Sequence, residues 1–131
     1  MSNISFAWTT AALLAGRKTV TRRMGSDDYY GRFQAGDILT AWDRSPRFKG
    51  KPIAKIELTE KPYIEPLFLM PDADYEGEGF AYFDANPEII PKYWHKTFKE
   101  RNISTFRQWF TISQDCMDPM WVIRFKVLEI I

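Results

Sequence analysis

The sequence predicts a single domain of the β-dominated α+β class: a small β-barrel of five or six strands, closed or partly closed, with peripheral helices. Its length of 131 residues is typical of one domain, so residues 1–131 are expected to share one core. Hydrophobic residues make up 45% of the chain and aromatic residues 16%, which is enough to fill that core. Several short segments alternate in polarity, and closure into a barrel would pair the edges of such strands.

The first third of the chain predicts two short strands around a helical turn. Residues 4–8 have the composition of a strand, and residues 11–15 (AALLA) favour a helical turn. Gly16 is expected to end this turn, because glycine tolerates the left-handed conformation found after many helices. The β-branched run at residues 19–21 favours the second strand, and the polar, glycine-bounded residues 25–34 are expected to form a loop.

The middle of the chain predicts two paired strands and a long irregular segment. Residues 37–43 (DILTAWD) and 52–59 (PIAKIELT) alternate in polarity and are separated by a basic turn, as in a β-meander. Residues 65–88 contain seven acidic residues and no Lys or Arg. Because Gly77 and Gly79 interrupt this segment, regular structure is not expected around EGEGF.

The last third predicts one or two helices and a closing strand. Aromatic residues recur at helical spacing after Pro91, and this aromatic stripe is expected to cover the barrel core. The stripe consists of Trp94, Phe98, Trp109 and Phe110. Residues 120–130 (MWVIRFKVLEI) alternate in polarity and should form a strand with one wetter face.

Charge and motif content exclude several functional classes. The chain contains eighteen basic and seventeen acidic residues, and this balance predicts neither general binding to polyanions nor a membrane-surface protein. No apolar run reaches the length needed to span a bilayer, so no membrane partner is expected. The single Cys116 cannot form an intramolecular disulfide and fits a reducing, cytoplasmic location. No common metal or nucleotide motif is present, and we expect neither a metal nor a cofactor.

The most informative segment is the basic corner formed by residues 16–24 (GRKTVTRRM), with four cations and no acid. Neighbouring cations repel one another by about 1 kcal/mol in water, so a compensating anion is expected. The acidic residues of segment 65–88 could supply it, or a ligand phosphate that an arginine fork would bind. A solvated surface corner is the third interpretation.

Three sequence blocks carry a resemblance to a known family. Residues 14–23 (LAGRKTVTRR), 35–39 (AGDIL) and 78–80 (EGF) occur in the order found in the ASCH domain family, and the first block is the most specific. This family is a branch of the PUA-like β-barrels. The resemblance implies a barrel with a cleft lined by the basic corner. It also implies a link to RNA, because different branches are described as a cytidine-derivative amidohydrolase and as a ribonuclease.

The resemblance also implies candidate catalytic residues. The motif positions of the N(4)-acetylcytidine amidohydrolase branch match Lys18, Thr21 and Glu78. By this correspondence Thr21 is the nucleophile, Lys18 the general base and Glu78 the general acid. The chain departs from that branch at Arg22-Arg23, where the branch has an apolar residue and a single arginine. This pair resembles phage-associated members with a KTxTRR corner, for which no reaction is implied.

The proposed chemistry sets two requirements on the structure. Residues 18 and 21 of one regular strand point to opposite faces, so Lys18 must lie in the turn after Gly16, while Thr19 and Thr21 point inward. As a base, Lys18 also needs its pKa lowered from about 10.4 to near 7. Burial and the neighbouring arginines favour this, and the acids around Glu78 would have to keep that carboxyl protonated. The alternative is a structural salt bridge between Lys18 and Glu78.

We therefore expect the partner to be RNA or a modified nucleoside, bound in the cleft with or without hydrolysis. One alternative is an amidohydrolase acting on N(4)-acetylcytidine-type substrates. A second is a metal-independent ribonuclease in which Lys18 is the base toward a 2′-hydroxyl. The candidate binding residues combine cations and hydroxyls of the corner with aromatic side chains on which a base could stack. They are Arg17, Thr19, Arg22, Arg23, Tyr29, Tyr30, Trp42 and Arg44.

Overall fold

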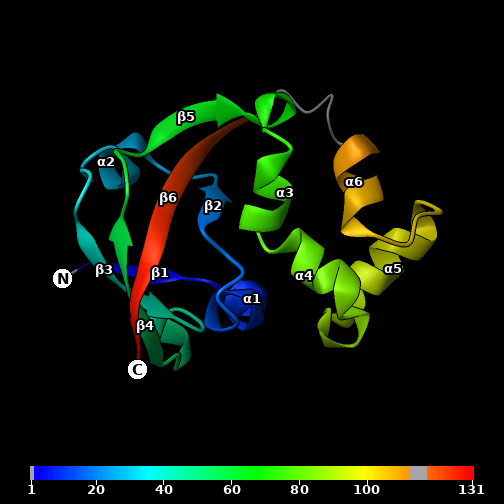
Figure 1. The fold of residues 1–131 in the computed structure, drawn as a ribbon, viewed down its shortest axis with the longest axis horizontal. Coiled ribbons are helices and arrows are strands. Elements are labelled where there is room, and N and C mark those ends of the chain that lie inside the picture. Colours follow the sequence, from blue (N-terminus) through cyan, green and yellow to red (C-terminus); the bar gives the residue numbers. More distant parts are fainter. Residues whose placement is uncertain (1, 113–117) are drawn as a thin grey trace.

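A computed structural model describes residues 2–112 and 118–131. The described residues form a mixed six-stranded sheet that curls into a half-barrel, with helices packed beside it (Figure 1). The strands are β1 (Asn3–Ser5), β2 (Val20–Arg23), β3 (Ile38–Trp42), β4 (Pro52–Leu58), β5 (Tyr63–Pro66) and β6 (Pro119–Ile130). The helices are α1 (Thr10–Leu14), α2 (Asp27–Tyr30), α3 (Ala73–Gly77), α4 (Phe80–Ala85), α5 (Lys92–Glu100) and α6 (Phe106–Ile112). This arrangement confirms the predicted fold class.

Strand β6 organises the sheet, whose order is β1-β3-β4-β6-β2 with β5 also paired to β6. One end of β6 pairs with β4, and the other end has β2 on one side and β5 on the other. Val122 therefore lies opposite both Arg22 and Tyr63. Figure 1 shows β6 as the long curved strand that joins the two parts of the sheet. Its curvature brings the basic corner of β2 toward α3.

The described residues contain two hydrophobic clusters rather than one. The first fills the half-barrel and includes buried Leu39, Ile56 and Phe125. The second lies among α1 and α4–α6 and has Phe83 and Phe106 at its centre. In Figure 1 the helices α4, α5 and α6 extend to one side of the sheet. They pack largely on one another and on the α1 region.

Most strand and helix predictions are confirmed within a few residues. The strands predicted at residues 37–43, 52–59 and 120–130 correspond to β3, β4 and β6, and the late helices to α5 and α6. The first strand is shorter than predicted, because the chain turns into a 3-10 helix (Ala7–Thr9) at Ala7, where φ is +46°. Gly16 ends the first helical turn with φ of +72°, as predicted.

Two loop predictions are wrong. Residues 25–34 contain α2, which is stabilised by the Ser26 hydroxyl accepting a hydrogen bond from the amide of Tyr29 at 3.2 Å. Residues 65–88 contain part of β5, then α3 and α4. The glycines do not prevent helices here, because Gly77 is the last residue of α3 and Gly79 lies between the two helices with φ of +95°.

The aromatic stripe also has a different partner from the one predicted. Trp94, Phe98 and Trp109 belong to the second cluster and not to a cover over the barrel core. Trp8 from the N-terminal segment joins them, with ring centroids 5.6 Å from Trp94. Cys116 and the Phe110 side chain lie outside the part of the chain that the structure describes. In the described ranges, no helix is both long and apolar enough to cross a membrane.

Candidate functional site

Lys18 lies in the turn between α1 and β2, where the sequence predicts it. The left-handed Gly16 reverses the chain, and the Arg17 amide donates to the Ala12 carbonyl at 2.9 Å. This turn directs the next side chain inward, so that only 2% of Lys18 is exposed. Its Nζ donates hydrogen bonds to the Glu78 backbone oxygen at 2.8 Å and to Glu78 Oε1 at 3.3 Å. The ammonium group thus reaches a segment that is sixty residues away in the sequence.

Glu78 reaches Lys18 because two glycines allow close backbone approaches. A Cβ added at Gly79 would lie 2.8 Å from the Ala12 Cβ, so α1 packs directly on this position. A Cβ added at Gly77 would lie 3.0 Å from Thr19 Oγ1, and the Thr19 amide donates to the Gly77 carbonyl at 2.8 Å. These contacts fix the end of α3 against the start of β2. Glu78 lies between the two glycines, where it is 6% exposed.

Thr21 completes the predicted trio. It is a buried residue of β2, opposite Ile123 of β6. Lys18, Thr21 and Glu78 all line one cavity of about 290 Å³, which we call the Lys18 cavity. Its other lining residues are Ser5, Phe6, Ala7, Trp8, Thr9, Arg22, Arg23, Phe80 and Trp94. The expectation for Thr19 is wrong: it is exposed, because β2 begins only at Val20 and Thr19 belongs to the preceding turn.

Arg22 connects the cavity to three carboxylates. Its Nη1 donates to Glu78 Oε2 at 3.0 Å, and its Nη2 donates to Glu65 Oε1 at 3.0 Å and to Asp74 Oδ2 at 2.6 Å. Arg124 of β6 binds the same Asp74 through two hydrogen bonds of 2.8 Å. Glu65, Asp74 and Glu78, with Arg22 and Arg124, form what we call the carboxylate cluster. It supplies internal anions for two cations of the basic corner, Arg22 and Lys18.

Burial and charge shift several protonation equilibria in the cavity. Burial lowers the pKa of Lys18; Glu78 opposes this effect, while Arg23 and Arg22 add to it, and the net pKa lies below the usual value. Burial alone would raise the pKa of Asp74, but its hydrogen bonds to Arg124 and Arg22 outweigh burial and bring that pKa below its usual range. Lys18 therefore loses its proton more readily than a solvated lysine does.

Of the acids expected to act on Glu78, which are Asp72, Asp74 and Glu76, the structure brings only Asp74 close to it. Arg22 donates to both Asp74 Oδ2 and Glu78 Oε2, so the two carboxylates share one cation. Asp74 also pairs with Arg124, whereas Glu76 pairs with Arg17 at 3.0 Å on the surface and Asp72 is exposed. The charge of Asp74 is therefore compensated by two arginines.

Arg23 follows Arg22 on β2 but has different neighbours. Its Nε donates to Thr21 Oγ1 at 3.4 Å, and its Nη2 donates to the Ser5 carbonyl. Its guanidinium lies over the Phe6 ring, 5.3 Å from the centroid. Among the described residues, no carboxylate lies within ion-pair distance of Arg23.

Two predicted aromatic binding residues lie on α2, away from the Lys18 cavity lining. Tyr29 and Tyr30 pack against the barrel cluster, with ring centroids 5.0 Å apart. The Tyr29 hydroxyl donates to the Asn3 carbonyl at 2.5 Å. Tyr30 interacts electrostatically with Arg23. Tyr30 is therefore next to a cavity residue, whereas Tyr29 connects α2 to β1.

The remaining predicted binding residues also lie outside the Lys18 cavity. Arg17 is exposed at the outer side of the corner, and Trp42 Nε1 donates to Asn3 Oδ1 at 3.0 Å. Arg44 is exposed and lines a neighbouring hollow of about 290 Å³. This hollow shares Ala7 and Trp8 with the Lys18 cavity. The two hollows therefore adjoin at the N-terminal segment.

Sequence reasoning missed the aromatic wall of the cavity and part of the carboxylate cluster. This wall combines three segments that are far apart in the sequence: the N-terminal segment with Phe6 and Trp8, α4 with Phe80, and α5 with Trp94. The spacing of these residues does not indicate that they meet. Arg124 did carry a signal, because it stands between two apolar residues of a strand, Ile123 and Phe125, that are both buried. A charged residue in such a strand indicates a partner, here Asp74.

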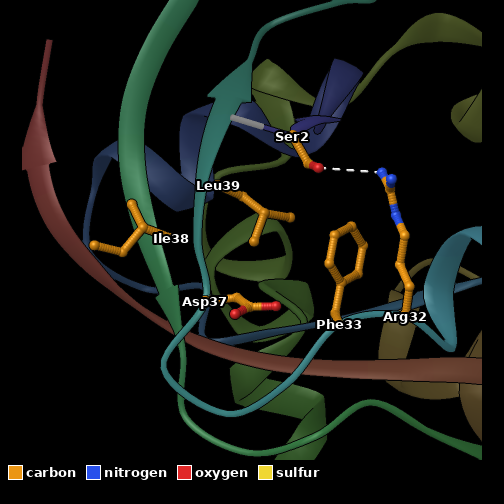
Figure 2. A pocket seen from close by; sticks show the side chains of 6 residues that line it. All are labelled: Ser2, Arg32, Phe33, Asp37, Ile38 and Leu39. Carbon is orange, nitrogen blue, oxygen red and sulfur yellow. Dashed lines mark hydrogen bonds between the residues drawn. The ribbon is translucent and has the colours of Figure 1, made fainter.

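Another hollow, of about 270 Å³, lies near the start of β3 (Figure 2). In Figure 2 Arg32 reaches toward Ser2, and its Nη2 donates to the Ser2 hydroxyl at 3.1 Å. Asp37 accepts a hydrogen bond from the Gln34 amide at 2.8 Å, which closes the turn before β3. The first of these hydrogen bonds connects Arg32 to the N-terminal segment, and the second lies within the turn, so both have a structural role. In the parts of the chain that the structure describes, no group of three or more His, Cys, Asp or Glu residues could hold a metal ion.

Comparison with known proteins supports the fold. No protein-family model and no curated protein sequence matches the chain. The structure is similar to protein EF3133 from Enterococcus faecalis V583, of the family DUF984, with a TM-score of 0.58 and 17% identity, covering 100% of this chain and 82% of that one. It also matches an ASCH domain from Lactobacillus crispatus JV V101, with a TM-score of 0.49 and 16% identity, covering 96% and 79%.

The curled sheet and the Lys18 cavity define a β-dominated α+β domain with a buried polar site at the junction of β2 and α3. The similarity to EF3133 supports the fold class that the sequence predicts.

Proposed function

We propose that the Lys18 cavity binds a modified nucleoside, either free or as part of RNA. The observation that carries this proposal is the meeting of Lys18, Thr21 and Glu78, all buried, in one cavity with an aromatic wall. Flat bases stack on aromatic rings, while their edges and substituents need hydrogen-bonding groups. The cavity offers both kinds of contact. The resemblance of residues 14–23, 35–39 and 78–80 to the ASCH family supports the same class of ligand.

The size of the cavity supports a single base with its substituent. Ligand pockets usually measure about 300–1,000 Å³, and the Lys18 cavity, at about 290 Å³, lies at the lower limit. Phe80 and Trp94 line it from the helical layer, and Phe6 and Trp8 from the N-terminal segment. A base stacked on an aromatic side chain gains about 1–3 kcal/mol. The wall can therefore supply much of the binding free energy.

Binding can be tested by calorimetry with N(4)-acetylcytidine, cytidine and adenosine. N(4)-acetylcytidine is expected to bind, and Phe80→Leu to weaken its binding about tenfold or more, in line with the loss of one stacking contact. Phe48→Leu is the matched control, because Phe48 is 65% exposed and lies in the loop between β3 and β4. Failure of all three nucleosides to bind, or equal effects of the two substitutions, would contradict the proposal.

Hydrolysis of an N(4)-acyl group is the second candidate function. It is favoured by two observations: Lys18 and Thr21 line the same cavity, and burial lowers the pKa of Lys18, which makes this amine a better proton acceptor near neutral pH than a solvated lysine. Thr21 Oγ1 would attack the acetamide carbon while Lys18 takes its proton. The C–N bond then breaks as Glu78 protonates the departing nitrogen, and cytidine leaves. Water hydrolyses the acetyl ester on Thr21 and releases acetate.

The Lys18–Glu78 contact supports the proton balance of this reaction. Lys18 gains one proton from Thr21 and Glu78 gives one to the leaving group, so transfer across the 3.3 Å contact restores both residues. Without this contact, each residue would have to exchange its proton with water. The Lys18–Glu78 contact therefore supplies one of the connections that two successive proton transfers need, and the shared cavity brings Thr21 to the same site.

Product analysis tests hydrolysis and separates it from ribonuclease action. Lys18→Met, Thr21→Val and Glu78→Gln should each reduce cytidine release about 10²–10⁴-fold, while Arg101→Gln, at an exposed position, should leave it unchanged. Labelled RNA is incubated in parallel. Chain scission that depends on Lys18 would instead favour the base role toward a 2′-hydroxyl. Full hydrolysis by Lys18→Met would exclude the catalytic role of this residue.

An RNA partner is further supported by the loop between β3 and β4. Arg44, Arg47, Lys49 and Lys51 lie in this loop, and all four are exposed. The adjoining hollow connects Arg44 to the wall residues Ala7 and Trp8 of the Lys18 cavity. Phosphate contacts here would make oligonucleotide affinity fall with salt, by about 0.7 logarithmic units per contact and tenfold change in salt. Binding of a free nucleoside should lack this dependence.

A further inference from the structure

Arg23 differs from the other cations at the Lys18 cavity in its partners. Lys18 contacts Glu78, and Arg22 contacts all three carboxylates of the cluster. The direct partners of Arg23 are uncharged groups: the Thr21 hydroxyl, the Ser5 carbonyl, the Phe6 ring and the Tyr30 hydroxyl. Glu78 acts on Arg23 only from beyond ion-pair distance. A guanidinium that is largely removed from water and has no anion is costly, because desolvation is not repaid by an ion pair.

The ion pairs around the cavity show which cation lacks a carboxylate. Three cations line the cavity: Lys18, Arg22 and Arg23. Lys18 pairs with Glu78, and Arg22 pairs with Glu65, Asp74 and Glu78. Among the described residues, Arg23, which is next to Thr21, has no carboxylate within ion-pair distance.

We infer that Arg23 is the anion site of this cavity and binds the oxyanion that forms when the Thr21 hydroxyl attacks an acyl carbon. This inference rests on the proposed hydrolytic function. Arg23 Nε lies 3.4 Å from Thr21 Oγ1, and the oxyanion would be attached to the same carbon as Oγ1. The N–H that now points to the hydroxyl is therefore close to the place where negative charge develops.

The electron balance of the step gives Arg23 a defined role. As Oγ1 bonds to the acyl carbon, the π pair of the carbonyl moves to its oxygen, which becomes the oxyanion, and the hydroxyl proton goes to Lys18. When the C–N bond breaks, the same pair restores the carbonyl. Arg23 stabilises only the charged intermediate and the transition states on either side of it, so its effect belongs to kcat more than to KM.

The other two cations that line the cavity are poorly suited to this role. Arg22 is 4% exposed and uses three donors on carboxylates. Lys18 is held by two hydrogen bonds to Glu78 and is needed as the base. Burial, opposed by Tyr30 and Glu78, lowers the pKa of Arg23, as expected for a cation that lacks a close anion. Arg23 is nevertheless a guanidinium and keeps its charge at neutral pH.

The first test uses acetate, a small carboxylate and the product of the proposed reaction, as the probe. Acetate is titrated calorimetrically into the wild-type protein, Arg23→Gln, Arg23→Lys and the exposed control Arg101→Gln. We expect Arg23→Gln to lose at least tenfold in acetate affinity, Arg23→Lys to recover part of it, and the control to match the wild type. Equal acetate affinity of the wild type and Arg23→Gln overturns the inference. If Arg23→Gln does not fold, the comparison of Arg23→Lys with the wild type decides.

Kinetics with N(4)-acetylcytidine form the second test. Arg23→Gln should reduce kcat about 10²–10³-fold, the usual effect of removing one oxyanion donor, with KM nearly unchanged. Unchanged kcat would overturn the inference and leave the proposed hydrolysis intact. If no variant and no wild-type protein hydrolyses the substrate, but acetate binding still depends on Arg23, the hydrolytic proposal fails while the anion site stands.

Discussion

Replacing Asp74 by Asn tests the carboxylate cluster most directly. Asp74 accepts three hydrogen bonds of 2.6–2.8 Å from two arginines that reach it from different strands, Arg22 of β2 and Arg124 of β6. The substitution keeps the size and shape of the side chain. It removes the negative charge and turns one acceptor into an amide donor, which faces an arginine N–H.

The structure sets the expected magnitude. Asp74 and Arg22 are 7% and 4% exposed, and removing one partner of a buried ion pair costs about 3–5 kcal/mol. Arg124 is 26% exposed and can be partly solvated by water, so the lower limit of about 3 kcal/mol applies. With a urea m-value of about 2 kcal/mol per molar, the unfolding midpoint should fall by about 1.5 M.

The effect should depend on pH in a defined direction. The folded-state pKa of Asp74 lies below its ordinary value of 3.8, so the stabilisation is fully present above 3.8. It is lost as the pH falls through the folded-state pKa, because the unfolded chain takes up the proton first. The difference in free energy of unfolding between wild type and Asp74→Asn should therefore be constant near pH 7 and shrink below pH 3.8.

The assay is urea unfolding followed by far-ultraviolet circular dichroism and tryptophan fluorescence at pH 7, 5 and 3. Asp72→Asn is the matched control, because Asp72 is two residues away and exposed, and its substitution should change stability by less than about 0.5 kcal/mol. A loss below about 1 kcal/mol for Asp74→Asn at pH 7 would refute the reasoning. So would a loss that persists undiminished at pH 3.

Three further predictions concern Lys18, Gly79 and Asp84. The pKa of Lys18, measured by NMR with labelled lysine, should lie below 10.5. Because the unfolded chain binds this proton more tightly, the contribution of Lys18 to the free energy of unfolding should rise with pH between its folded-state pKa and 10.5. Gly79→Ala should lower the free energy of unfolding by about 2–3 kcal/mol in urea, because φ is +95° and the new Cβ would lie 2.8 Å from the Ala12 Cβ. Gly36→Ala is the control: φ is +88° but the space around the new Cβ is open, so the loss should be about 1 kcal/mol. Asp84→Ala should cost about 1–2 kcal/mol by thermal unfolding, because its carboxylate accepts hydrogen bonds at 2.7 and 3.1 Å from the first two amides of α6.

The turn before β2 was predictable because its signals are local. Gly16 follows an alanine- and leucine-rich helical turn, and the β-branched residues after it favour extended structure. The requirement that Lys18 and Thr21 share a cavity then excluded a regular strand through both positions. The structure places Lys18 in the turn and Thr21 on β2. Local pattern and chemistry pointed to the same geometry.

The segment of residues 65–88 was not predictable in the same way. Glycine and acid content disfavour helices when each turn is considered alone. Here Gly79 allows α1 to pack closely on the chain between α3 and α4, and Gly77 allows the end of α3 to approach the start of β2. The acidic residue Asp74 contacts arginines of the sheet. These are long-range contacts, and they stabilise α3 and α4 beyond what the local sequence favours.

The predicted aromatic binding residues also depend on long-range contacts that the local sequence does not show. The sequence predicts Tyr29 and Tyr30 as binding residues because a polar loop would expose their rings, but these residues belong to α2 and their rings pack against the barrel cluster. The rings that line the cavity, Trp8 and Trp94 among them, belong to segments that look like ordinary core. A sequence pattern indicates that a side chain is apolar, but not which of two clusters it joins.

Arg22 links the stability of the fold to the geometry of the cavity. It pairs with Glu65 and Asp74, which lie behind the cavity, and with Glu78, which lines it. A substitution that loosens Asp74 therefore frees Arg22 to shift, and the Glu78 carboxyl loses one of its two cationic partners. Asp74→Asn should accordingly weaken nucleoside binding at urea concentrations where the protein is still folded, although Asp74 does not line the cavity. If binding and stability changed independently, the cluster would support the fold only, and the Arg22–Glu78 contact would not contribute to nucleoside binding.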